Sequence, residues 1–386
     1  MDTSRTRNKK MGFARLIAGN IAIFGLLLIT VEGLASYGLL VRDVMTTNSL
    51  AERRHTTYDP DLGWVNEPNV YIPDMYGPGV YLRTNAQGFR NNHEINAAVP
   101  AGKVRVVCSG DSFTFGYGVD NAHTWCEQLS VLDPRLETVN MGQGGYGVDQ
   151  AYLWYKRDAA KIEHQVQLLA FITDDFYRML SDSFAGQYAK PVLDVANGTL
   201  VVKNVPVPRR AYYFTWVTQN IENLKSLRTV EFLNRVQRKI RVAPTDSPQL
   251  TQRERDEKAR KILRTIFEDL QRLNQQHSSK LVLVYLPTIY ELEGKGLPQW
   301  TDPEEWTEFL EEEARALGIP LINLFSEFRS LPDNEMVHLF IPKGQLPYLS
   351  AEGHFNDAGN ELVARVIHDK LMNHPAISCV LSARLS

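Results

Sequence analysis

The sequence predicts an α/β fold with a mainly parallel central sheet covered by helices. Short apolar runs typical of buried strands alternate with longer helical patterns between residues 104 and 372. The chain has 386 residues, 44% of them apolar, so it can bury one large core with additions. The formal net charge of −3 offers no basic face for phosphate groups, which excludes nucleic acid from the expected partners.

Five strands and five helices are expected in alternation. The predicted strands cover residues 104–108, 137–141, 166–172, 280–287 and 319–325. The predicted helices cover residues 122–132, 149–160, 251–276, 303–317 and 357–372. Opposite charges are dense in residues 251–276, and this pattern predicts a solvated helix.

The first forty residues differ in kind from the rest. Five basic residues between positions 5 and 15 precede an apolar stretch at 16–41, which is long enough to cross a bilayer. The flanking positive charge predicts that residues 1–15 are cytoplasmic and that the chain after 41 lies on the extracytoplasmic, periplasmic side of the inner membrane. A cleaved signal peptide is the alternative, because residues 33–36 read GLAS. We favour an uncleaved anchor, since cleavable apolar cores are usually about 7–15 residues long.

Two further parts are expected beyond this anchor. Residues 42–100 are rich in Pro, Gly and Asn and form a lead-in that packs on the main domain, residues 101–386. An insertion at about 181–249 interrupts the α/β order with a hairpin signal at Asn197-Gly198 and an amphipathic helical pattern at 216–242.

Three cysteines are too few for a disulfide framework. Cys108 is predicted to lie in the core, and a bridge between Cys126 and Cys379 is possible but not favoured by any pattern.

Polar or glycine residues follow the first three predicted strands. Ser112, Gly145 and Asp174 each stand just past one of them, and ligand sites of open parallel sheets form at the carboxyl ends of the strands. A serine hydroxyl needs a base to become a nucleophile. His354, in a polar turn before the last helix, is the expected base, and His338 is the fallback.

The blocks that carry these residues resemble those of the SGNH hydrolases, also called the GDSL esterase family. Gly110-Asp111-Ser112 matches the first block, NMGQGGYG with Asn140 and Gly145 the second, FITDDF the third, and EGHFNDAG the last. The resemblance covers residues 104–372, interrupted by the insertion. It implies a flavodoxin-like three-layer sandwich, and the transmembrane helix predicted from the apolar stretch at 16–41 precedes this fold.

The resemblance also implies a role for each matching residue. Ser112 is the nucleophile and His354 the general base, while the amides of Ser112 and Gly145 and the side chain at position 174 hold the oxyanion. The remaining polar residues of the blocks are expected to support the site, namely Asp111, Asn140 and Asp175.

The sequence departs from the family pattern at two of these positions. Asp174 stands where the family has an oxyanion-stabilising Asn, and an ionised carboxylate cannot donate a hydrogen bond. Thr173 is a possible replacement donor. Relatives carry an Asp three positions before the His, where this chain has Ala351, so Glu352 is the expected orienting acid. Asp357 is expected to cap the last helix instead.

The expected activity is that of a membrane-anchored serine esterase acting on small acyl esters, including O-acetyl groups of envelope polysaccharide, without metal or cofactor. One alternative is an O-acyltransferase that passes the acyl group to a glycan, with Tyr188, Tyr212, Tyr213 and Trp216 as candidate groove residues. Another is a catalytically silent scaffold or glycan-binding module. A metal hydrolase is the least favoured class, because the sequence lacks spacing such as His-Glu-x-x-His.

Overall fold

The computed structural model describes most of the chain. The described residues are 3–46, 55–184, 188–208, 229, 232, 236, 250–294, 303–346, 351–375 and 377–379. The chain divides into two compact units, one formed by Met1–Thr47 with Pro208–Gln249 and the other by Asn48–Val207 with Leu250–Ser386. The candidate catalytic and oxyanion residues all lie in the second unit, whereas the candidate groove residues Tyr212, Tyr213 and Trp216 lie outside the described residues.

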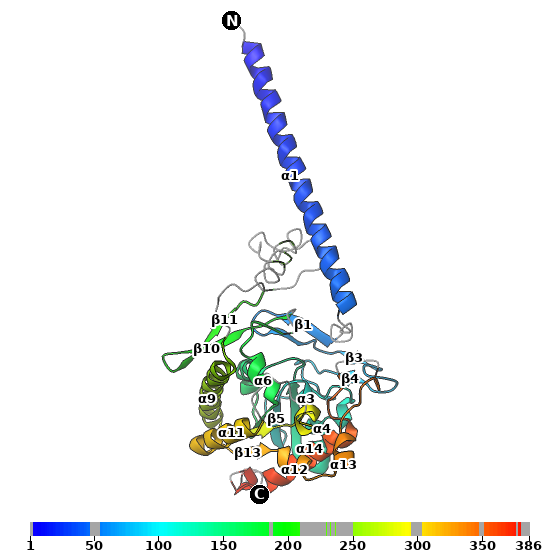
Figure 1. The fold of residues 1–386 in the computed structure, drawn as a ribbon, viewed down its shortest axis with the longest axis vertical. Coiled ribbons are helices and arrows are strands. Elements are labelled where there is room, and N and C mark those ends of the chain that lie inside the picture. Colours follow the sequence, from blue (N-terminus) through cyan, green and yellow to red (C-terminus); the bar gives the residue numbers. More distant parts are fainter. Residues whose placement is uncertain are drawn as a thin grey trace. The chain divides into compact units, whose positions relative to one another are not determined.

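The second unit is built on a five-stranded parallel sheet (Figure 1). Its strands are β5 (Val104–Gly110), β6 (Leu136–Gly142), β7 (Val166–Phe171), β12 (Lys280–Tyr285) and β13 (Leu321–Asn323). They lie in the order β13-β12-β7-β5-β6, which is the flavodoxin-like order 2-1-3-4-5 when the strands are counted along the chain. The predicted α/β fold class is therefore confirmed.

Helices cover both faces of this sheet (Figure 1). One face packs against α5 (Val148–Arg157), α9 (Gln252–Gln276) and α11 (Pro303–Leu317), and the other against α4 (Trp125–Leu132) and α14 (Asp357–Asn373). Strand side chains alternate between the two layers because the period of a strand is two. In β5, Val106 and Cys108 join one buried cluster and Val107 the other.

Shorter elements connect these layers. The short helices are α3 (Ser112–Phe115), η1 (Asn121–His123), η2 (Ala159–Lys161), α6 (Thr173–Arg178), α10 (Ile289–Leu292), α12 (Phe325–Arg329) and α13 (Asp333–Val337). The two-stranded antiparallel pairs are β1 (Thr56–Asp59) with β2 (Gly63–Asn66), β3 (Tyr71–Ile72) with β4 (Leu82–Arg83), β8 (Ser183–Phe184) with β9 (Tyr188–Ala189), and β10 (Val192–Ala196) with β11 (Thr199–Lys203).

Helix α9 corrects one expectation. It begins with a capping box in which Thr251 and Glu254 each accept the other's backbone N–H. Besides its many charged residues, the helix has an apolar stripe at helical spacing. Ile262, Ile266 and Phe267 on that stripe are fully buried. The prediction of a solvated helix was wrong for this face, which forms part of the main core.

The hairpin expected in the insertion is confirmed. Asn197 and Gly198 both have positive φ, at 50° and 74°, as a two-residue turn with right-handed twist requires. They join β10 and β11, where Ala196 pairs with Thr199. The helix expected at 216–242 lies outside the described residues apart from positions 229, 232 and 236.

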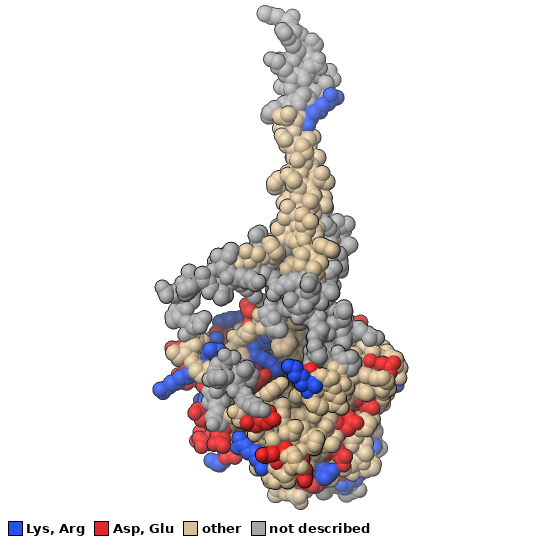
Figure 2. All heavy atoms as spheres, turned by 45° about the vertical axis from the view of Figure 1, so that its right-hand side comes forward, with Lys and Arg blue, Asp and Glu red and all other residues tan. Residues whose placement is uncertain are grey.

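The first unit contains α1 (Thr3–Thr46). Among the described residues, one helix is long and apolar enough to cross a membrane, by its segment Arg15–Leu39. Figure 2 shows few charged side chains along the described part of α1, whereas acidic and basic side chains are interspersed over the visible face of the second unit. Glu32, the acidic residue within the apolar stretch, is buried in this unit, and its carboxylate accepts a hydrogen bond from the backbone N–H of Thr229 at 2.7 Å.

The cysteines show no bridge. Cys108 and Cys126 are buried, Cys379 is exposed, and all three are free thiols. The bridge considered between Cys126 and Cys379 is therefore not formed.

Candidate active site

The nucleophile and the base predicted from the sequence meet in the structure. His354 Nε2 lies 2.8 Å from Ser112 Oγ, although the two residues are 242 positions apart. This separation is a normal hydrogen-bond distance and fits a base that takes the serine proton. The fallback His338 is exposed, and its backbone carbonyl accepts a hydrogen bond from Asn356 Nδ2.

The turn after β5 places Ser112 at the start of the short helix α3. Asp111 is the N-cap of this helix, and its Oδ1 accepts the Phe113 N–H at 2.9 Å. Asn140 on the neighbouring strand β6 donates through Nδ2 to the Thr114 carbonyl at 2.9 Å. Two of the expected supporting residues thus hold the backbone that carries the serine.

His354 is positioned by aromatic packing. The imidazole lies 4.4 Å from the ring centre of Phe113 and 5.3 Å from that of Tyr117. The following helix α14 is capped by Asn356, whose Oδ1 accepts the Gly359 N–H at 3.0 Å, and not by Asp357 as expected. Burial, with a smaller contribution from the Arg178 charge, lowers the pKa of His354 to about 4. The ring is therefore neutral at pH 7 and able to accept a proton.

The structure does not bring Glu352 to the base. The Glu352 carboxylate accepts the backbone N–H of Gly344 at 3.0 Å instead. His354 Nδ1 is buried and has no hydrogen-bond partner among the described residues. The backbone carbonyls of Ala351 and Glu352 favour the protonated ring and raise its pKa, but neither lies in hydrogen-bond geometry with Nδ1. Ser112 and His354 thus form a dyad in the described structure.

The third block forms a charge cluster around one arginine. Arg178 Nη1 lies 2.6 Å from Asp175 Oδ1 and 3.3 Å from Asp111 Oδ2, and Nη2 lies 3.6 Å from Asp174 Oδ2. Nη1 also donates to the carbonyl of Tyr146, the residue after Gly145, at 3.2 Å. Arg178 therefore links the cap of the nucleophile helix to the loop that carries the expected oxyanion donor.

Burial changes the protonation of this cluster. It raises the pKa of Asp174 to about 6, with smaller contributions from Glu291 and Asp111, while Arg178 opposes the shift. Burial also raises the pKa of Asp175 and of Asp111, which repel each other. Asp174 can thus exist as a neutral hydrogen-bond donor under mildly acidic conditions.

Replacing Arg178 with glutamine is expected to lower the free energy of unfolding by about 3 kcal/mol at pH 7, because crowded carboxylates would lose their counter-charge. The folded-state pKa values of these carboxyls are already raised by burial, and without the arginine, which lowers them, they would rise further. The stability they contribute is then present at low pH and lost as pH rises through the folded-state pKa, so the deficit should shrink at pH 5.

Urea unfolding of the full chain in detergent, followed by tryptophan fluorescence, measures this loss. The matched control is Arg365→Gln, which removes an exposed pair with Glu361 and should cost less than about 0.5 kcal/mol. Equal losses for the two variants would contradict a structural role for the cluster.

Gly145 and Thr173, the other residues expected at the oxyanion site, differ in whether their surroundings fit that role. Gly145 has a φ of +74°, and a Cβ there would lie 2.7 Å from the ring of Phe184, so both conformation and space require glycine. Thr173, the proposed replacement donor, is buried and its hydroxyl is bonded to Tyr285, at 2.6 Å, and to the Glu291 carboxylate. Because the Thr173 hydroxyl is already engaged in these two hydrogen bonds, it is not available to donate to the oxyanion.

Sequence reasoning missed Arg178, Tyr117 and Phe184. A signal for Arg178 was present, because it follows Asp174 and Asp175 by four and three positions on a helix, where side chains meet. Tyr117 and Phe184 carried no comparable signal, since their contacts depend on loop geometry. Within the described residues, no group of three or more His, Cys, Asp or Glu side chains is arranged to hold a metal ion.

Comparison with known proteins gives structural neighbours but no sequence relatives. No family model matches the chain, and a search of curated proteins finds no match. A member of the lipolytic protein G-D-S-L family from Veillonella parvula is 13% identical, with a TM-score of 0.39, over 70% of this chain and 100% of the other.

Two more neighbours have similar scores. The acetyl xylan esterase AlAXEase is 15% identical, with a TM-score of 0.38, over 69% of this chain and 98% of its own. A lipase/acylhydrolase from Enterococcus faecalis is 12% identical, with a TM-score of 0.38, over 69% of this chain and 95% of its own. The family indicated by the motifs is thus found among the structural neighbours. At these scores the likeness carries no argument about activity, which rests on the geometry of the site.

Proposed function

We propose that the protein is a serine esterase that cleaves small acyl esters through an acyl-serine intermediate. The observation that carries this proposal is the 2.8 Å contact between Ser112 Oγ and His354 Nε2, with the imidazole neutral at pH 7. A silent scaffold has no need for a neutral histidine in contact with a serine at the carboxyl edge of the sheet.

The reaction follows from the positions of these two side chains. Ser112 Oγ attacks the ester carbonyl carbon while His354 Nε2 accepts the hydroxyl proton. The tetrahedral oxyanion forms beside the amides of Ser112 and Gly145. The bond to the alcohol oxygen then breaks, the alcohol leaves with the proton from His354, and the acyl group remains on Ser112. His354 then takes a proton from water, which attacks the acyl-serine; the bond between the acyl carbon and Ser112 Oγ breaks, Oγ receives the proton from His354, and the carboxylic acid leaves.

The proposed setting is the outer face of the inner membrane, with α1 as the anchor. Support comes from the apolar segment Arg15–Leu39 and from the basic residues that precede it. An esterase held there meets acyl groups on envelope polysaccharide, and these are the substrates we propose.

A fluorophosphonate probe tests the proposal on the full chain in detergent. Wild type is expected to be labelled at Ser112, as read by peptide mass spectrometry, and labelling should disappear in Ser112→Ala and His354→Ala. Ser330→Ala, which removes an exposed hydroxyl, should be labelled like wild type. A folded wild type that takes up no probe would overturn the esterase and favour the silent scaffold.

A further inference from the structure

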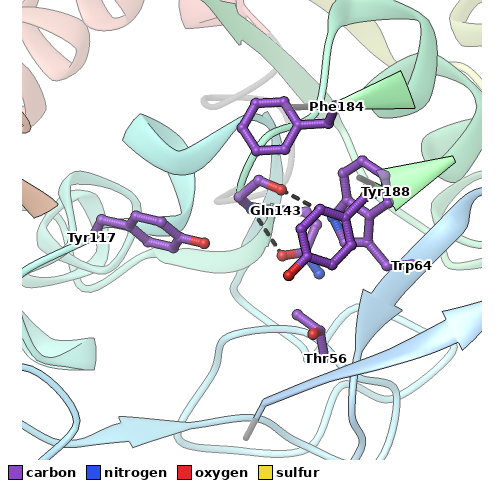
Figure 3. Close-up of a pocket in the computed structure, with 7 residues that line it drawn as sticks. Thr56, Trp64, Tyr117, Gln143, Phe184 and Tyr188 are labelled. Carbon is purple, nitrogen blue, oxygen red and sulfur yellow. Dashed lines mark hydrogen bonds between the residues drawn. The ribbon is translucent and has the colours of Figure 1, made fainter. Parts of the chain in front are cut away.

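Two cavities share one aromatic side chain, Phe184, in their lining. The smaller has a volume of about 20 Å³, and Trp64, Tyr117, Gly144, Phe184 and Tyr188 are among the residues that line it (Figure 3). The larger has a volume of about 330 Å³, and its lining includes Asp174, Arg178, Ser181, Ser183 and again Phe184. The Phe184 ring therefore forms a wall common to both cavities.

Two residues that line the smaller cavity, Tyr117 and Gly144, link it to the reacting residues. Tyr117, on one side of it in Figure 3, packs 5.3 Å from the His354 ring and donates its backbone N–H to the Ser112 carbonyl at 3.2 Å. Gly144 on another side precedes the expected oxyanion donor Gly145. An ester carbonyl placed between the serine and this glycine would direct its acyl substituent toward the smaller cavity.

The walls of the smaller cavity are held in place. Trp64 Nε1 donates to the Gly144 carbonyl at 3.0 Å, and its ring packs 6.2 Å from Phe184 and 5.8 Å from Tyr188. The Arg178 guanidinium lies over the Phe184 ring, 5.6 Å from the ring centre. A cavity of about 20 Å³ has space for one small group about the size of a water molecule, so a methyl group is the acyl substituent that fits it best.

The larger cavity has a different character. It is lined by carboxylate, guanidinium and hydroxyl groups beside the Phe184 ring, and its volume falls in the range of small-molecule sites. The polar groups can hydrogen-bond to the alcohol part of an ester that carries several hydroxyl groups, and the rings of Tyr177 and Phe184 can pack against its carbon skeleton.

We propose that Phe184 determines acyl-chain length, confining the acyl group to acetyl in the smaller cavity and leaving the larger cavity to a polyhydroxylated alcohol. This inference rests on the proposed esterase function and deepens it. Phe184 acts by steric exclusion and takes no part in proton transfer.

The test compares kcat/KM for the acetate, butyrate and hexanoate esters of p-nitrophenol, using the full chain in detergent. Wild type should prefer acetate over butyrate by about a hundredfold, which is in the range of discrimination by small apolar pockets. Phe184→Ala should reduce this preference to less than about tenfold, chiefly through a gain on butyrate. Phe184→Leu, a milder truncation, should give an intermediate ratio and guards against a folding defect in the alanine variant.

The matched control is Tyr71→Ala, which removes an exposed aromatic ring from β3 and should leave the ratio unchanged. Fluorophosphonate labelling distinguishes a failure of the proposed Phe184 role from a failure of the proposed esterase function. Labelled wild type with an unchanged acetate-to-butyrate ratio in both Phe184 variants would overturn the role of Phe184 and leave the esterase standing. Absence of labelling in folded wild type would overturn both.

Discussion

Replacing Ser112 with alanine is expected to lower kcat for acetyl ester hydrolysis by about ten-thousandfold or more, because no other hydroxyl in the described part of the chain is hydrogen-bonded to His354. His354→Ala should cost a similar factor, since a neutral serine is a weak nucleophile without its base. The double variant should lose no more than either single one, because the two side chains act as one unit. Steady-state rates of the three variants, measured with p-nitrophenyl acetate, give this comparison.

Glu352→Gln is the informative control for this dyad. In the structure the Glu352 carboxylate bonds to the Gly344 amide and not to His354, so glutamine should change kcat by less than about threefold. A loss near ten-thousandfold would instead show that Glu352 orients the imidazole during turnover, as the sequence predicted. Purely additive losses for Ser112→Ala and His354→Ala would contradict the dyad itself.

Asp174→Asn is expected to raise activity by up to about a hundredfold at pH 8 and to have little effect at pH 5. Burial raises the pKa of Asp174 to about 6, so at pH 8 the carboxylate is ionised and, in the proposed oxyanion role, would repel the developing negative charge. At pH 5 it is mostly protonated and can donate a hydrogen bond, as an asparagine amide does at every pH.

The pH dependence of kcat/KM provides the measurement. Wild type should gain activity as pH rises through the His354 pKa of about 4 and lose it as pH rises above about 6. Asp174→Asn should retain the first transition and lack the second. Asp333→Asn, an exposed carboxyl on α13, should behave like wild type. A variant less active than wild type at pH 8 would mean that the charged form of Asp174 assists the reaction.

The sequence by itself determined the layered core and the two residues of the dyad. Strands β5, β6 and β7 are rich in apolar residues and buried along almost their whole length, because parallel strands are covered on both faces and need no strict alternation. Ser112 was identifiable because it follows such a strand directly, and His354 because it stands in a polar turn before the last helix. Both residues can be recognised from their local sequence, and the topology of the parallel sheet places both at the edge formed by the carboxyl ends of its strands.

Only the tertiary structure decided the surroundings of the dyad. The partner of Glu352 is a backbone amide eight positions away, and side-chain type and spacing do not specify such a contact. Helix α9 was mistaken for a solvated helix because its charges outnumber the buried residues on its apolar stripe. The wall formed by Phe184 depends on how the β8–β9 hairpin lies against Gly145. Periodicity indicates which residues a fold buries, and motifs indicate candidate site residues. Contacts between loops depend on the packing of the whole chain.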